Sequence, residues 1–134
     1  MLKKLKIESN IDNINAVENA IDSITNEIGI NQDSYGKILI AVLEAVNNAI
    51  VHGNKSRKEK KVDISFTFTR NILKVSVKDE GNGFNPEIVP DPTKPENVEA
   101  LNGRGIFLMT KLADGVKFNR KGNSVDLTFK NILS

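Results

Sequence analysis

The segment from Ile38 to Val51 constrains the fold more strongly than any other part of the chain. Glu44 is the single formal charge among its fourteen residues, and Asn48 follows it by four positions. Residues four apart in a helix share one face, so this acid and this amide project together. Because a carboxylate is costly to bury without a partner, the pair is either a polar group bonded to backbone or a site that holds a water, a hydroxyl or Mg²⁺.

Apolar residues lie on two sides of this predicted helix, which we expect to be capped by Asn31 or Asp33 and to end at Gly53. One face carries Ile38, Val42, Val46 and Ala49. Ile40 and Val51 lie nearly opposite and flank the acid–amide face. A helix that is apolar on both sides is normally covered on both sides, so we expect a ligand, or a segment closing over one, above the acid–amide face.

Most of the remaining pattern is strand-like. Alternating apolar residues predict strands at 2–7, 62–69, 72–78, 116–119 and 124–131, and steps of three and four predict a helix at 11–28. The turns within the two hairpins are short, so their strands must pair antiparallel. With a third helix at about 106–112, this order predicts an α+β two-layer sandwich. Its sheet is expected to be mixed, mostly antiparallel and covered on one face by about three helices.

Length and composition exclude several classes of protein. We expect residues 1–134 to form one domain, because this length supports a single core. A net charge of +2 gives no strong attraction to nucleic acid or to membrane surfaces. The absence of cysteine excludes disulfides, zinc–thiolate sites and thiol nucleophiles. With no signal peptide and no long uninterrupted apolar segment, we expect a cytoplasmic protein without a transmembrane helix.

Asp79-x-Gly81-x-Gly83 directly follows a predicted strand. Glycines at this position allow a backbone to approach a flat ligand closely. The carboxylate of Asp79 could then accept a hydrogen bond from an exocyclic amine such as that of adenine. The simpler interpretation is a glycine turn with a capping Asp.

Gly103-Arg104-Gly105 opens the third predicted helix. Free N–H groups and the positive end of the helix dipole suit phosphate there, although a plain loop-to-helix junction is the simpler interpretation of the motif alone. Just before it, all four prolines fall within ten residues. Because proline resists helix interiors and central strands, residues 85–102 are predicted to form a long irregular loop of the kind that often covers a ligand.

In this order and spacing, the motifs resemble those of the Bergerat-type ATP-binding domain of the histidine kinase-like (GHKL) superfamily. Residues 43–53 are similar to the N box of that superfamily, residues 78–84 to its first glycine box and residues 103–109 to its second. Within the superfamily, the Glu-Ala-Val-Asn-Asn-Ala-Ile-Val-His-Gly form of the N box resembles most the anti-sigma factor serine/threonine kinases, which are small single-domain proteins.

The resemblance implies a role for each motif residue. Glu44 would be the general base that aligns or deprotonates the attacking hydroxyl, and Asn48 would ligate Mg²⁺. Asp79 would bind the adenine amine, and residues 85–102 would form the ATP lid. The residues implied to contact the nucleotide are Asn48, Asp79, Gly81, Gly83, Gly103, Arg104, Gly105 and Ser124.

One position departs from the family pattern. The family usually has Gly-Thr before the final strand, where this chain has Gly122-Asn123-Ser124. We expect Asn123 or Ser124 to take the place of the threonine by hydrogen bonding near the adenine-binding carboxylate.

The implied function is ATP- and Mg²⁺-dependent phosphorylation of a serine or threonine on a STAS-type anti-anti-sigma protein. The same resemblance implies sequestration of a sigma factor in a partner-switching pathway that regulates transcription. It also implies a homodimer that makes no direct contact with nucleic acid or membrane. The alternative is a non-catalytic module that binds its partners according to the nucleotide it holds.

Overall fold

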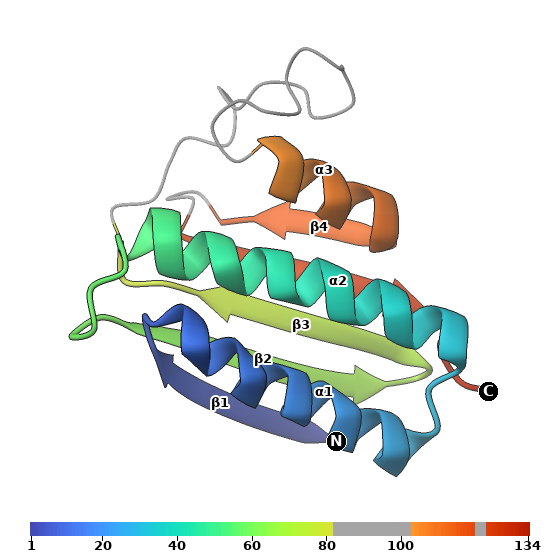
Figure 1. The fold of residues 1–134 in the computed structure, drawn as a ribbon. Coiled ribbons are helices and arrows are strands. Elements are labelled where there is room, and N and C mark those ends of the chain that lie inside the picture. The colour runs from blue at the N-terminus through green and yellow to red at the C-terminus, as the bar shows by residue number, and fades with distance from the viewer. Residues whose placement is uncertain (82–102, 120–122) are drawn as a thin grey trace.

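The computed structural model describes residues 1–81, 103–119 and 123–134, and it forms two layers with the helices on one face of a sheet (Figure 1). The elements are β1 (Leu2–Glu8), a 3₁₀ turn η1 (Ile11–Asn13), α1 (Ile14–Ile28), α2 (Gln32–Asn48), a π-helical turn η2 (Ala49–Gly53), β2 (Lys61–Thr69), β3 (Ile72–Lys78), α3 (Gly103–Leu112), β4 (Gly115–Phe118) and β5 (Ser124–Lys130). The predicted α+β two-layer sandwich is therefore confirmed.

The five strands are ordered β1-β2-β3-β5-β4, and every neighbouring pair among them is antiparallel. No parallel pair occurs among these described strands, so the mixed character expected of the sheet is not seen in them. β5 lies between β3 and β4, and its register places Ser124 opposite Lys78. This pairing brings the end of β3 beside the start of β5, and so places Asp79 next to Asn123.

The core lies between the sheet and the helices. Alternate residues of β2, β3 and β5 face the helices and are buried: Val62, Ile64, Phe66, Leu73, Val75, Val77, Val125, Leu127 and Phe129. The predicted stripe of α1 packs on them, and α1 ends at Gly29 in a left-handed conformation with φ of 76°. Asn31 caps α2, because its Oδ1 accepts the N–H of Ser34 at 2.8 Å.

α2 is the central helix, and it contacts α1, α3, β3 and β5. Among the described residues, Gln32–Gly53 is long and apolar enough to cross a membrane by length and composition, which the sequence pattern had not led us to expect. The core helix of a soluble protein passes the same test. Here Ile38, Val42 and Val46 are fully buried inside the domain, so its apolar character is explained by packing.

Candidate nucleotide-binding site

Glu44 and Asn48 lie one turn apart on α2, and both side chains are half-buried. Within the described residues neither side chain has a hydrogen bond or ion pair. This rules out, for that part of the chain, the interpretation of a polar pair bonded to backbone. A carboxylate and an amide oxygen that are partly withdrawn from water and left free for a ligand are suited to a hard cation or a hydroxyl.

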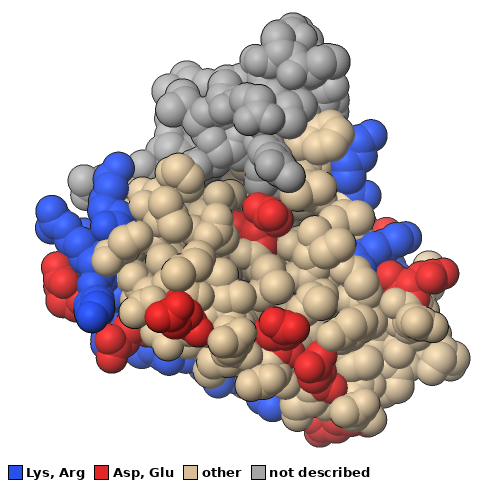
Figure 2. Space-filling model, in the orientation of Figure 1, with Lys and Arg blue, Asp and Glu red and all other residues tan. Residues whose placement is uncertain are grey.

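The surface around this pair is apolar and open. Ile40 and Val51, which flank it, are 46% and 38% exposed. Figure 2 shows that the helical face of the molecule carries few basic groups, because Lys and Arg gather at its edges. The segment predicted to cover this face, 85–102, lies outside the described residues, as does Gly83. The lid and the wall role of Gly83 therefore remain predictions.

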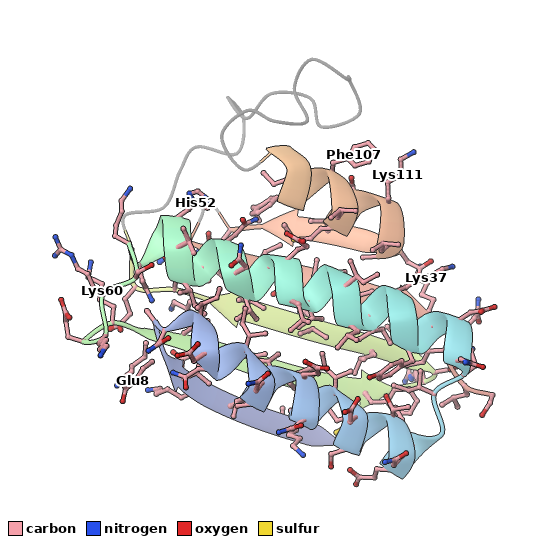
Figure 3. The ribbon with its side chains drawn as sticks, in the orientation of Figure 1. Glu8, Lys37, His52, Lys60, Phe107 and Lys111 are labelled. Carbon is pink, nitrogen blue, oxygen red and sulfur yellow. The ribbon has the colours of Figure 1, made fainter. Side chains whose placement is uncertain are left out.

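The helix that carries Glu44 and Asn48 ends in the π-helical turn η2. The N–H of Asn54 donates to the carbonyl of Ala49, five residues back, at 2.8 Å. Turns of this width are rare and are found mostly at functional sites. The sequence pattern correctly predicted that the helix would end at Gly53, with His52 in its last turn (Figure 3), but gave no sign of the wider turn.

The wide turn ends against Asp79, which follows β3. Asp79 is 8% exposed, and its Oδ1 accepts the N–H of Gly81 at 2.7 Å. A Cβ placed on Gly53 would lie 2.3 Å from Oδ2 of Asp79, and a Cβ on Gly81 would lie 2.0 Å from the carbonyl oxygen of Gly53. Glycine is therefore required at both positions, because the end of η2 and the segment after β3 pack closely on each other. The carboxylate is thus held at the end of the helix that carries the acid–amide pair.

Asn123, which precedes β5, is bonded to the main chain of Asp79. The N–H of Asp79 donates to the carbonyl of Asn123 at 2.9 Å, and Nδ2 of Asn123 donates to the carbonyl of Asp79 at 3.3 Å. Oδ1 of Asn123 accepts from Nδ2 of Asn119 at 2.7 Å. Of the two residues expected to replace the threonine, Asn123 is therefore the one bonded to Asp79. Its carbonyl and its side-chain amide both bond to main-chain atoms of Asp79. Ser124 is half-buried in the first position of β5, and its contact with nucleotide remains a prediction.

Gly103, Arg104 and Gly105 form the first turn of α3, as the glycine motif predicted. α3 packs against α2, and Figure 1 shows its first turn at the end of the molecule where α2 runs into η2. The start of a helix at this end is suited to an anion, because the N–H groups of a first helical turn point toward it. The phosphate-binding role of these three residues remains a prediction.

Two residues of this region had no functional interpretation from sequence. Gly53 was identified as a helix stop and as the last residue of the segment similar to the N box, with no role of its own, and Asn54 only as the first residue of a basic loop at 54–61. Asn54 is fully buried and bonded through its side chain. A signal was available for Gly53, because a glycine at the end of a helix can mark a close approach of backbone as well as a helix stop.

Residues 7–129 match the family described as the histidine kinase-like ATPase domain. The chain belongs to this family. Its similarity to curated relatives is modest but extends over most of each chain. It is 28% identical over 132 residues to the serine-protein kinase RsbW of Bacillus subtilis, covering 93% of this chain and 82% of that one. It is 26% identical over 124 residues to RsbW of Oceanobacillus iheyensis, covering 88% and 78%.

A solved structure shows the same fold. The RsbU and RsbW domains of Rv1364c from Mycobacterium tuberculosis superpose with a TM-score of 0.71 at 16% sequence identity. The match covers 97% of this chain and 32% of that longer one. The three-helix, antiparallel-sheet arrangement of this histidine kinase-like ATPase domain is therefore shared with a solved structure that includes an RsbW domain.

Proposed function

We propose that this protein is an ATP-dependent protein serine/threonine kinase. The observation that carries the proposal is the packing of Asp79 against Gly53, which puts a buried carboxylate at the end of the helix that holds Glu44 and Asn48. Family membership supports the use of ATP, and the similarity to proteins named serine-protein kinase RsbW supports a serine as the acceptor.

The donor set fits magnesium bound together with nucleotide. Among the described residues, no three His, Cys, Asp or Glu side chains cluster to hold a metal. Mg²⁺ keeps most of its ligands from water and substrate phosphates and needs only one or two from protein. The amide oxygen of Asn48, which has no hydrogen-bond partner among the described residues, would be such a ligand. When bound, Mg²⁺-ATP supplies the phosphoryl group and the neutralisation of its charge.

The chain's own groups then position the reactants, which is most of what phosphoryl transfer requires. The carboxylate of Asp79 would orient the nucleotide by accepting from the adenine amine. The carboxylate of Glu44 would accept the proton of the attacking serine hydroxyl. The serine oxygen would bond to the γ-phosphorus of ATP as the bond from that phosphorus to the β,γ-bridging oxygen breaks, and ADP would leave. The N–H groups at the start of α3 would hold the phosphates.

The substrate we propose is a STAS-type anti-anti-sigma protein, and the protein that the kinase sequesters is a sigma factor, with the chain acting as a cytoplasmic homodimer. These partners are proposed from the resemblance of the N box to the anti-sigma factor kinases. We propose that the protein makes no direct contact with nucleic acid or membrane.

Transfer of ³²P from γ-labelled Mg²⁺-ATP to a purified STAS partner tests the kinase proposal. Labelled partner is expected with the wild-type protein, and the label should be lost when the acceptor serine is replaced by alanine. A protein that binds Mg²⁺-ATP tightly and still transfers no phosphate would favour the alternative, a nucleotide-dependent binding module. Absence of any Mg²⁺-ATP binding would refute both.

A further inference from the structure

Asn54 is a fully buried polar residue at the start of the basic loop that leads into β2. Its Oδ1 accepts the N–H of Glu80 at 2.8 Å. Its Nδ2 donates to Oγ of Ser9 at 2.7 Å and to the carbonyl of Lys61 at 3.0 Å. One carboxamide thus joins four segments: the end of η2, the residue after β1, the start of β2 and the loop after β3.

The direction of this network is set by its acceptors. Oγ of Ser9 donates to the carbonyl of Lys60 at 2.5 Å, so it can only accept from Asn54. Both hydrogens of Nδ2 are then used, and Oδ1 is left to face the N–H of Glu80. Figure 3 places Lys60 at the end of the molecule where β1 finishes at Glu8. A buried carboxamide is tolerated only when bonded in this way, so Asn54 is tied to one orientation.

The hydrogen bond from Glu80 to Asn54 fixes the peptide group that directly follows Asp79. The preceding N–H, that of Asp79 itself, is held from the sheet side by the carbonyl of Asn123. Asn54 holds the next N–H from the helix side. The backbone on both sides of the Asp79 side chain is therefore fixed, and the carboxylate itself packs against Gly53, the residue before Asn54.

We infer that Asn54 is a positioning residue for the nucleotide site: it sets the Asp79 carboxylate relative to the α2 helix, and through that carboxylate it sets selectivity for adenine. This rests on the proposed function, in which Asp79 accepts from the adenine amine. Guanine carries a carbonyl at the corresponding position and is repelled by a well-placed carboxylate. A displaced carboxylate loses both the attraction and the repulsion.

The test compares Asn54→Ala with Ser9→Ala, which weakens the same buried network but leaves the contact between Asn54 and Glu80. Dissociation constants for Mg²⁺-ATP and Mg²⁺-GTP are measured by calorimetry, alongside melting temperatures without nucleotide. Asn54→Ala is expected to bind ATP about tenfold more weakly and to lose most of the preference for ATP over GTP. Ser9→Ala is expected to melt earlier but to keep the wild-type preference, with ATP affinity within about threefold.

Asn54→Asp is the second variant, because it keeps an oxygen to accept the N–H of Glu80 and should retain the preference for ATP that Asn54→Ala loses. The inference is overturned if folded Asn54→Ala keeps the wild-type preference, if Ser9→Ala loses it equally, or if neither Asn54 variant folds. Wild-type protein that binds no Mg²⁺-ATP overturns the proposed function, and with it this inference. Normal wild-type binding with unchanged selectivity in the variants overturns the inference alone.

Discussion

Replacing Gly53 by alanine should damage the protein at the contact between the end of η2 and Asp79. The added Cβ would lie 2.3 Å from Oδ2 and 2.4 Å from Cγ of the Asp79 carboxylate. That carboxylate has little room to retreat, since it is 8% exposed and holds the N–H of Gly81 at 2.7 Å. Either the backbones separate or the carboxylate turns away and gives up its hydrogen bond.

Separation of packed segments costs about 1–3 kcal/mol. Loss of a hydrogen bond to a charged group costs about 1.5–3 kcal/mol. These two responses are alternatives, so their costs are not added. We take about 2–3 kcal/mol as the steric cost of the clash. Alanine in place of a helical glycine returns about 0.5–1 kcal/mol of backbone entropy. The expected net loss for Gly53→Ala is about 2 kcal/mol, or a melting temperature about 6–10 °C lower for a chain of this size.

Gly36 provides the matched control, because it lies inside α2 and a Cβ there would meet nothing within 4 Å. Gly36→Ala should gain the entropy term alone and stabilise the protein by about 0.5–1 kcal/mol. Urea unfolding followed by far-UV circular dichroism gives both free energies, and their difference isolates the steric term. If Gly53→Ala proves as stable as Gly36→Ala, the close packing of Gly53 on Asp79 is wrong.

Three further predictions concern the site and its surroundings. Glu44→Gln should lower the rate of phosphoryl transfer about 10²–10⁴-fold while ATP affinity stays within a few-fold, and an unchanged rate of ³²P transfer would remove Glu44 as the base. Asp79→Asn should weaken ATP binding at least about tenfold by calorimetry, and equal affinity would refute the adenine assignment. The hydroxyl of Tyr35, the single tyrosine, donates to Oδ1 of Asp22 at 2.5 Å, and this hydrogen bond is the main cause that raises the pKa of the phenol above 10.0. The associated stabilisation is present below pH 10 and lost as the pH rises through the raised value, so an absorbance titration near 295 nm should show that Asp22→Asn lowers the pKa. An unchanged titration would mean that the contact is absent in solution.

Much of the fold was predictable because its signals are local. The steps of three and four in α1 and the alternation in β2 and β3 each depend on a few neighbouring residues. The strands predicted at 62–69 and 72–78 leave only Arg70 and Asn71 for the turn between β2 and β3, and both residues have positive φ, 53° and 61°, as tight hairpins require. The insertion of β5 between β3 and β4 was not predictable, since no short turn joins β3 to β5.

The candidate site also combines features that follow from local sequence with features that depend on distant segments. The shared face of Glu44 and Asn48 follows from helical periodicity, and so could be read from spacing. Their freedom from partners within the described residues depends on what surrounds them, which spacing does not contain. Asn54 lies in a basic stretch that looks solvated, and its burial arises from segments that are distant in the sequence, so no local pattern could reveal it.

The packing of α2 divides the site into a rigid part and an adjustable part. Glu44 and Asn48 belong to one continuous helix whose opposite side is buried in the core. Their spacing along the helix axis therefore stays at about 6 Å when the surrounding loops change conformation. The Asp79 carboxylate depends instead on a wide helical turn, two glycines and one buried carboxamide. Under the roles proposed for these residues, substitutions in that second group would change which nucleotide binds, and how tightly, without altering the geometry of phosphoryl transfer. Within such a fold, specificity and chemistry can diverge independently.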